Sequence, residues 1–438
     1  MFGYYLRLGT NSIRRHPALS FLMMLAVGLG IGVSMTLFSL HHTLSADPIP
    51  EKSDQLFAVT LDSWDPDNPY NEGNPEQPPW QLTYRDATAL LESDVPTRHL
   101  AMHKSYFTLN VDEEDVKPFM VVSRQTTKEF FNMFNVPFLY GNGWDATAEE
   151  SLDQVAVLSK KTNDKVFGGE NSVGKTVRFN THTFRVIGVL DTWEPHIKYY
   201  DVNNGPIAES EDVFVPFTLT EALELPFGGN NNCWKDEENI GHQGHLRSEC
   251  IWVQFWAELT SRSQKNEYQN WIDNYVTEQK KLGRFERPLN NKLDDVNSWI
   301  RANEVVPDDL TIMVGIAFLF MAVCLFNAVG LLLARFMAKS PIVALRRAVG
   351  ASKGAIFTQH LVEVGLIGIG GGLIGIVLAI IGLTGLSKMI EDISEVASFS
   401  WTLAGIAIGL SLGATLLAGL YPTWRICRVQ PSSQLKTQ

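Results

Sequence analysis

The sequence has little cysteine, and its longest apolar stretches have no charge at all. Only 4 of the 438 residues are cysteine, too few for a fold built on a disulfide framework. The zinc-protease pattern H-E-x-x-H does not occur. The uncharged apolar stretches are 18–40, 310–334, 364–387 and 396–424. Since none has an ionisable residue at its centre, no proton relay or ion path is visible in them.

These four runs are each long enough to cross a membrane, which needs about 20 apolar residues. The stretches before the first run, between the second and third, and after the fourth contain eleven Lys or Arg, and of acids only Glu363 at the border of the third run. The basic residues are Arg7, Arg14, Arg15, Arg335, Lys339, Arg346, Arg347, Lys353, Arg425, Arg428 and Lys436. Short basic flanks stay in the cytoplasm, which predicts an inner-membrane protein with both termini inside.

Charge separates the long segment 45–309 from the rest of the chain. It contains 44 of the 48 acidic residues but only 24 of the 36 Lys and Arg. An acidic insert of this size can bury its own core and argues against nucleic acid as a partner. We expect an α-helical membrane protein with four transmembrane helices and a large α+β extracytoplasmic domain between helices 1 and 2. The expected parts are 1–45, with an interfacial helix and an uncleaved first crossing, then the domain 46–306, then 307–438.

Strand-like and helix-like patterns alternate inside the insert. Strands are expected at 56–62, 118–124, 155–159 and 251–259, and a hairpin over 175–191, all rich in β-branched or aromatic residues. Amphipathic helices are expected at 84–93, 127–135, 160–167, 264–280 and 291–302. The insert is therefore predicted to be α+β.

Two of the cysteines, Cys233 and Cys250, lie in the insert, where oxidation is permitted. The segment between them is polar and rich in glycine and asparagine, and a disulfide would staple it. Two free thiols remain an alternative, and so does a metal site with His242 and His245. No other metal or cofactor ligands are indicated.

Glycines at four-residue spacing mark the membrane runs. Such spacing lets helix backbones approach closely, so we expect helix packing at these positions, against this chain or another. They are Gly28, Gly32, Gly368, Gly372, Gly405, Gly409 and Gly413.

The string 169–176 satisfies the phosphate-loop pattern G-x-x-x-x-G-K-[ST]. A nucleotide site also needs a strand before the loop and a helix starting at the lysine. Here a polar, helix-like stretch precedes Gly169, and a strand-like alternation follows Lys175. We interpret the string as a turn and expect no catalytic site in it.

Two stretches resemble a known family. Residues 134–191 resemble the periplasmic core domain of MacB-like transporter permeases through Gly141-Asn142-Gly143, 155–159, 167–169, 173–176 and 186–189. Residues 326–376 resemble the FtsX-like permease domain. The marks there are Asn327, the basic stretch 346–351, Glu363 and the glycine run, followed at the C-terminus by Tyr421-Pro422, Arg425, Arg428 and Pro431.

The resemblance implies a mechanism and partners. Such a permease would dimerise, with itself or with a paralogue, and dock on two copies of a cytoplasmic ABC ATPase that binds the ATP and Mg²⁺. The cytoplasmic loop 335–360 would provide a coupling helix, and movement would pass outward to the periplasmic domain. A periplasmic adaptor and an outer-membrane channel would complete the path, and membrane lipid surrounds the helices. The implied coupling residues are Val343, Leu345, Arg346, Arg347, Val349 and Gly350.

The implied activity is export of a drug-like compound, peptide or toxin, with ATP hydrolysis supplied by a separate subunit. An FtsX-like regulator of cell-wall hydrolases, a lipoprotein-extraction permease and a membrane-anchored enzyme remain alternatives. In one place the chain departs from the family, which often has Glu-Ile-Gly before the basic stretch, whereas this chain has Ile342-Val343-Ala344. The missing glutamate leaves a heterodimer of two permeases open beside a homodimer.

Overall fold

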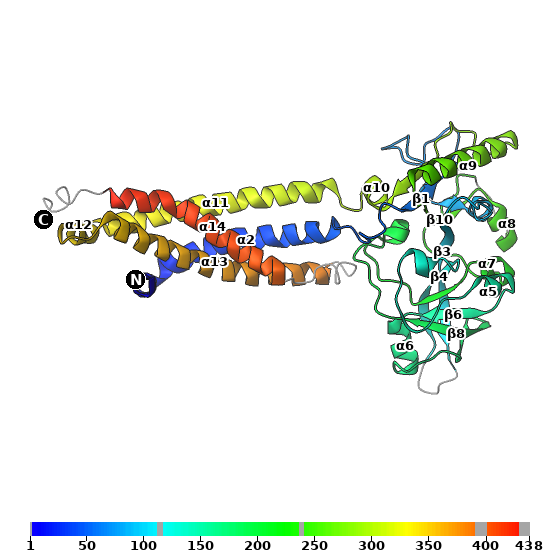
Figure 1. The fold of residues 1–438 in the computed structure, drawn as a ribbon, viewed down its shortest axis with the longest axis horizontal. Coiled ribbons are helices and arrows are strands. Elements are labelled where there is room, and N and C mark those ends of the chain that lie inside the picture. The colour runs from blue at the N-terminus through cyan, green and yellow to red at the C-terminus, as the bar shows by residue number, and fades with distance from the viewer. Residues whose placement is uncertain (1, 112–116, 236–240, 390–400, 429–438) are drawn as a thin grey trace. The chain divides into compact units, whose positions relative to one another are not determined.

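The computed structural model describes residues 2–111, 117–235, 241–389 and 401–428. The chain divides into two compact units (Figure 1). The membrane unit consists of Met1–Ala46 and Val306–Gln438, and the insert unit of Asp47–Val305. Pro431 and Lys436 of the basic C-terminal tail, and the first residues of the fourth apolar run, lie outside the described residues.

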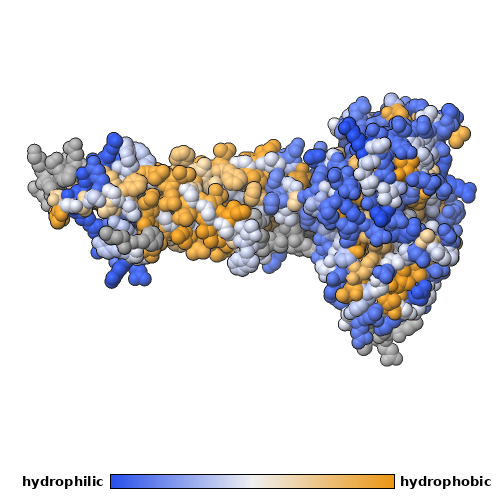
Figure 2. Space-filling model, viewed as in Figure 1, coloured by the Kyte–Doolittle hydropathy of each residue, from blue (hydrophilic) through white to orange (hydrophobic). Residues whose placement is uncertain are grey.

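The membrane unit is helical. Its helices are α1 Phe2–Arg15, α2 Pro17–Leu44, α11 Asp308–Ala338, α12 Ser340–Ala348, α13 Lys353–Met389 and α14 Trp401–Cys427. Within the described residues, four helices are long and apolar enough to cross a membrane, namely α2, α11, α13 and α14. Figure 2 shows apolar side chains over much of the visible surface of these helices, whereas the visible surface of the insert unit is mainly hydrophilic.

Helix α13 begins well before the apolar run that predicted it. The run starts at residue 364, but the helix starts at Lys353. The first turns are amphipathic: Ile356 and His360 are buried, while Lys353 and Thr358 are exposed. Only 349–352 separate α12 from α13, so most of the expected cytoplasmic loop is helical.

Close backbone packing joins α2 to α13. A Cβ added to Gly28 would lie 2.6 Å from Ile374 Cγ2, and one added to Gly32 would lie 2.7 Å from Leu378 Cβ. On the opposite side of α13, a Cβ on Gly372 would lie 3.2 Å from Ser411 Cβ of α14. Gly368 faces Thr415 of α14 in the same way. Absence of a side chain at these four positions lets the helices touch.

The glycines of α14 differ from those of α2 and α13. A Cβ added at Gly405, Gly409 or Gly413 would meet nothing within 4 Å in the part of the chain that the structure describes. Close packing at this stripe therefore stays a prediction that concerns another chain.

The insert unit is built on one mixed sheet. Its strand order is β11-β1-β10-β3-β4-β9-β6-β8-β5, with β2 beside β10 and β7 beside β3 and β8. The pairs β4–β9 and β6–β8 are parallel, and the other pairs are antiparallel. The strands are β1 Leu56–Thr60, β2 Leu82–Thr83, β3 Arg98–Asn110, β4 Phe119–Thr126, β5 Phe138–Gly141, β6 Val155–Leu158, β7 Thr176–Phe179, β8 His182–Leu190, β9 Val213–Pro216, β10 Ile251–Glu258 and β11 Lys292–Asp295.

Helices of four to twenty residues connect the strands of this sheet. They are α3 Tyr84–Leu90, α4 Phe130–Met133, α5 Ala146–Glu150, α6 Lys160–Phe167, the 3₁₀ helix η1 Tyr199–Asn204, α7 Leu219–Ala222, α8 Gly241–Arg247, α9 Arg262–Lys281 and α10 Val296–Ala302. The helix predicted at 291–302 is wrong for its first part, because Lys292–Asp295 is a strand antiparallel to β1, and it is confirmed for Val296–Ala302. Asp295 then caps α10 by accepting a hydrogen bond from the Ser298 amide.

Two hydrophobic cores stabilise the insert unit, and the long strand β3 contributes to both of them. One core includes Trp252, Tyr268 and Ile272, from β10 and α9. The other includes Phe184 of β8 and Val213 of β9. Strand β3 supplies residues to each core, so the two cores share one continuous sheet.

Candidate coupling site

The linkers that join helix α12 to the membrane helices are very short. A single residue, Lys339, separates the end of α11 at Ala338 from the start of α12 at Ser340. Pro341 lies in the first turn of α12, where its missing amide costs no hydrogen bond. At the other end, Gly350 has a φ of +106°, a conformation that favours glycine and ends the helix. The sequence therefore fixes both ends of a short, separate helix.

The two faces of α12 have different surroundings. Val343 and Ala344 are buried, Val343 in a core with Phe336 of α11 and Ile356 of α13. The three apolar residues of the other face, spaced by three and four positions, are exposed. They are Ile342 (55% exposed), Leu345 (56%) and Val349 (82%), here called the apolar ridge.

This arrangement corrects one expected coupling residue. Val343 is only 5% exposed, so it anchors α12 to its own chain and is not available to a partner. The sequence showed three apolar residues on a basic stretch, but not which of them the neighbouring helices cover. Ile342 takes the place of Val343 on the exposed side.

The basic residues of α12 contact the helices beside it. Arg346 Nη1 donates to Gln359 Oε1 of α13 at 3.0 Å. Arg347 Nη1 donates to the carbonyl oxygen of Cys427, the last residue of α14, at 3.2 Å. These two arginines thus tie α12 to α13 and α14 while the apolar ridge stays exposed.

A buried ionic cluster lies at the junction of α11 and α12. Glu363 of α13 is fully buried, and its Oε1 lies 2.8 Å from Arg335 Nη2 and 3.1 Å from Lys339 Nζ. Ser12 of α1 donates to the same oxygen at 2.7 Å. Arg335 also donates to the Ser12 carbonyl and to the hydroxyl of Ser20 of α2, both at 2.9 Å. One carboxylate therefore connects α1, α11 and α13, and Arg335 adds α2.

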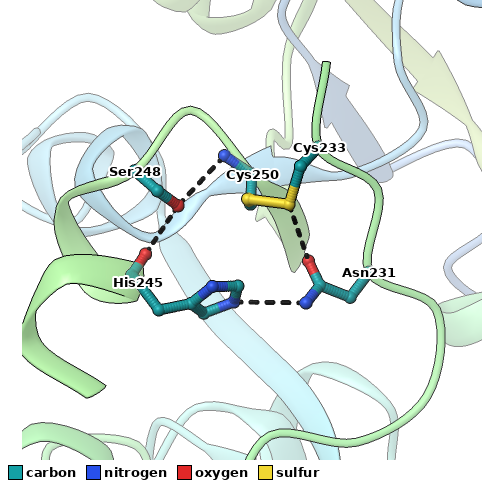
Figure 3. Close-up of a disulfide and its surroundings, with 5 residues drawn as sticks. All are labelled: Asn231, Cys233, His245, Ser248 and Cys250. Atoms are coloured by element: carbon teal, nitrogen blue, oxygen red, sulfur yellow. Dashed lines mark hydrogen bonds between the residues drawn. A yellow bond between two sulfur atoms is a disulfide. The ribbon is translucent and has the colours of Figure 1, made fainter. Parts of the chain in front are cut away.

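The insert unit has a disulfide between Cys233 and Cys250, whose Cα atoms are 4.2 Å apart (Figure 3). Asn231 lies beside it, with its amide nitrogen 3.2 Å from His245 Nε2. Ser248 Oγ donates to the His245 carbonyl and accepts from the Cys250 amide. These bonds hold Asn231 and the end of α8 beside the start of β10.

The disulfide leaves neither thiol free to hold a metal. His242 Nε2 lies 3.0 Å from the Leu225 carbonyl oxygen instead. Among the described residues, no group of three or more His, Cys, Asp or Glu is arranged to hold a metal ion.

A second buried charge network lies in the insert unit. Arg124 of β4 is fully buried and contacts Asp201 and Glu211, its Nε lying 3.1 Å from Glu211 Oε1. Lys198 Nζ lies 2.7 Å from the same oxygen, and Tyr200 donates its hydroxyl to Glu211 at 2.9 Å. Burial raises the pKa of Glu211, but the two cations outweigh burial and hold it below its usual range. Two positive and two negative charges compensate each other there.

Comparison with known proteins shows the family of the chain. The model of the MacB-like periplasmic core domain matches residues 20–275, more than half of the chain. The model of the FtsX-like permease C-terminal region matches residues 314–431. The chain belongs to the MacB/FtsX-like permease family.

Several relatives of this MacB/FtsX-like permease are known. A macrolide export ATP-binding/permease protein MacB of Marinobacter nauticus is 25% identical over 69% of this chain and 41% of its own length. That of Wolinella succinogenes is 24% identical over 82% and 49%. A pyoverdine export ATP-binding/permease protein PvdT of Pseudomonas entomophila is 24% identical over 70% and 41%. The chain thus spans less than half the length of these relatives.

The match to the solved periplasmic region of MacB from Actinobacillus actinomycetemcomitans covers 59% of this chain and 97% of the solved chain. The sequence identity is 15% and the TM-score 0.38. The two family models, and not this match, show the family.

The phosphate-loop string of this permease is a turn, as its flanking pattern predicts. Helix α6 precedes it, and β7 starts at Thr176 and pairs with β8. Gly169 and Gly174 have φ values of +84° and +91°, which explains both glycines. Lys175 Nζ lies 4.6 Å from the centre of the Phe167 ring. Strand β7, and not a helix N-terminus, follows the lysine directly, so the phosphate-binding geometry is not formed.

Sequence reasoning missed the Glu363 cluster as a site. Its members are up to 351 positions apart, so no local pattern connects Ser12 to Glu363. One signal was present: Glu363 is the one acid in the basic stretches between and beside the apolar runs. A lone acid among many cations next to a membrane run needs a partner, and the structure supplies Arg335 and Lys339.

Proposed function

We propose that this chain is the permease subunit of an ATP-driven ABC transporter of the MacB mechanotransmission type, placed in a bacterial inner membrane with its insert unit in the periplasm. Two copies of a separate cytoplasmic ATPase supply the energy, and the permease acts as a dimer. The transported compound is a drug-like molecule, a peptide or a toxin taken from the periplasmic side. A periplasmic adaptor and an outer-membrane channel belong to the same proposal.

The apolar ridge on α12 is the observation that carries this proposal. Ile342, Leu345 and Val349 are exposed on a helix whose opposite face is buried and whose flank is basic. Docking in a protein cleft would bury these side chains, each contributing about 1.5–3 kcal/mol before the costs of association. Because α12 is tied directly to α11, a partner that moves the ridge also moves a membrane helix.

The names of the relatives leave the substrate class broad. Some are named for macrolide export and others for pyoverdine export, which are chemically different compounds. The proposal for this chain therefore names no single compound. The rival regulatory and lipoprotein-extraction roles share the same ATPase docking and differ in what the insert unit contacts.

The departure from the family pattern lies on the ridge itself. Ile342 occupies the position where the family often has glutamate, and it is exposed. A homodimer would present two such ridges to the ATPase pair, whereas a heterodimer would present one. Counting permease chains in the purified complex, by native mass spectrometry, decides between them.

The test of the proposed function is Leu345→Asp in the full chain, purified in detergent from its source. A buried aspartate in the cleft would release the ATPase, so we expect its copurification and the ATP hydrolysis of the complex to fall at least about tenfold. Leu282→Asp is the matched control, because Leu282 is 75% exposed in the insert unit. A Leu345→Asp variant that keeps its ATPase and full hydrolysis overturns the proposal. A variant that instead loses binding to anionic lipid vesicles assigns the ridge to the membrane surface.

A further inference from the structure

The Glu363 cluster lies where the coupling helix joins the rest of the membrane unit. Lys339 is both the C-cap of α11 and the N-cap of α12, so a displacement of α12 acts on this residue directly. Its Nζ lies 3.1 Å from Glu363 Oε1 and donates to Ser12 Oγ at 2.6 Å. Arg335, one turn earlier on α11, reaches the same carboxylate. Both cations of the junction therefore meet α1 and α13 at one point.

Helix α1 is held against this point by close contact as well as by hydrogen bonds. A Cβ added to Gly9 would lie 2.9 Å from Leu366 Cδ1 and 3.7 Å from the Glu363 Cα. Ser12, one turn later, donates to Glu363 and accepts from Lys339. Thus α1 lies directly on the segment of α13 that carries the carboxylate, and its serine completes the ionic cluster.

Burial keeps the charged side chains of the Glu363 cluster in contact with one another. The side chains of Glu363 and Arg335 are 1% and 2% exposed. Separating buried partners leaves an uncompensated charge away from water, which costs far more than the intact pair contributes. Small displacements of the junction are therefore expected to move the partner helices rather than to open the cluster.

His360 supports the same carboxylate from one turn before it on α13. Its Nδ1 lies 3.7 Å from Glu363 Oε2, and its ring packs on Phe336 of α11 at 4.4 Å between centres. The carboxylate is thus held on both sides by residues of α11 and α13. Its position is fixed relative to the helix that leads into α12.

We propose that Glu363 is the positioning residue that transmits movement of α12 to α1, by holding Lys339, Arg335 and Ser12 on one buried carboxylate. This rests on the proposed function, in which an ATPase moves α12. Docking of the ATPase depends on the exposed apolar ridge, whereas the movement of α1 depends on the Glu363 cluster. The two roles can be separated by mutation.

The experiment uses the full chain with its copurified ATPase and two spin-label positions. Ser352, exposed in the loop after α12, reports on α12, and Asn11, exposed on α1, reports on α1. The native Cys324 and Cys427 are buried, and the other two cysteines form the disulfide. The measurement is the change in each label's spectrum between the nucleotide-free complex and the complex trapped with ATP and vanadate.

In Glu363→Gln, we expect the nucleotide-dependent change at Asn11 to fall at least about threefold, while the change at Ser352 and the copurification of the ATPase stay within about twofold. Ser12→Ala should have the same selective effect, and it leaves every charge paired. Ser12→Ala therefore tests the positioning role if the Glu363→Gln complex does not assemble. Gln359→Ala is the control, because it removes a bond from α12 to α13 that does not reach α1.

Each outcome has one meaning. A normal change at Asn11 in an assembled Glu363→Gln complex, or in Ser12→Ala, overturns the positioning role and leaves the proposed function standing. A wild-type complex without an ATPase, or without any change at Ser352, overturns the proposed function first. Equal losses at both labels would show that the cluster only stabilises the fold, and would also overturn the inference.

Discussion

Arg124 is a fully buried cation whose counter-charges come from a distant part of the chain. Asp201 and Glu211 are 77 and 87 positions away and are brought to β4 by η1 and by the segment before β9. Such a network adds little net stability when intact, but it strongly penalises the loss of one member. Stability of the insert unit should therefore respond more to Arg124 than to any surface charge.

Substitution Arg124→Met should lower the free energy of unfolding of the insert unit by about 3–5 kcal/mol, since it leaves two buried carboxylates with only Lys198. Thermal unfolding of the full chain in detergent, followed by tryptophan fluorescence, measures the loss. Lys281→Met, which breaks the exposed pair with Glu278, serves as the control and should change stability by less than about 0.5 kcal/mol. Equal effects of the two substitutions would contradict the prediction.

His103 gives the insert unit a dependence on pH. Burial lowers its pKa from 6.5 to about 3, and its ring is packed against Trp252 and Phe217. Between these pH values the unfolded chain binds a proton that the folded chain does not, so stability falls as the pH falls through this window. Burial also lowers the pKa of His99 and His245, which act in the same direction.

Between pH 7 and pH 5 we expect His103 to remove about 2 kcal/mol of stability. His103→Gln cannot take up this proton, so its unfolding temperature should vary less with pH than that of the wild type. Thermal unfolding at both pH values gives the comparison. A pH dependence that is unchanged in His103→Gln would refute the assignment.

At the scale of single elements, the turn 169–176 shows how a motif differs from the structure that gives it a function. Lys175→Ala should leave ATP hydrolysis by the assembled complex within about twofold of wild type, because the side chain packs on Phe167 and a strand, not a helix, follows it. The assay needs a check that the variant still copurifies its ATPase. Loss of hydrolysis from a normally assembled complex would mean that the lysine contacts nucleotide.

Elements with a strong periodic pattern could be predicted from the sequence, and short irregular ones could not. Lys160–Phe167 has the predicted bounds, because a serine cap and a left-handed Gly168 mark its ends. Strand β11 was missed because the segment KLDD has no β-branched residue and becomes a strand only by pairing with β1. The local sequence of a segment does not show that it pairs with a strand far away in the chain.

The same limit applies to the candidate site. The amphipathic, basic character of α12 could be seen in the sequence, but the burial of Val343 depends on α11 and α13. The Glu363 cluster joins residues from four helices, and no spacing rule relates them. Apolar composition predicts that helices cross a membrane, whereas their contacts depend on which faces meet.

At the scale of the whole molecule, charge predicts which unit faces which compartment. We expect a thiol introduced at Leu282, in the acidic insert unit, to react with a membrane-impermeant reagent in intact cells. A thiol introduced at Ser352, on the basic side and outside the apolar ridge, should react only after the membrane is permeabilised. Both positions are exposed, so the thiol itself is accessible at each of them. Labelling of the Ser352 variant in intact cells would reverse the topology.

The two units also differ in how their residues are ordered along the chain, and this affects biosynthesis. The insert unit is one continuous segment, whereas the membrane unit is completed only by residues after Val306. Gly28 of α2 meets Ile374 of α13, 346 positions later. At about 5–20 residues per second, the ribosome needs roughly 20–70 s to supply that partner. During this time the α13-facing surface of α2 faces lipid or an insertion factor, while the insert unit has all its residues and can fold outside.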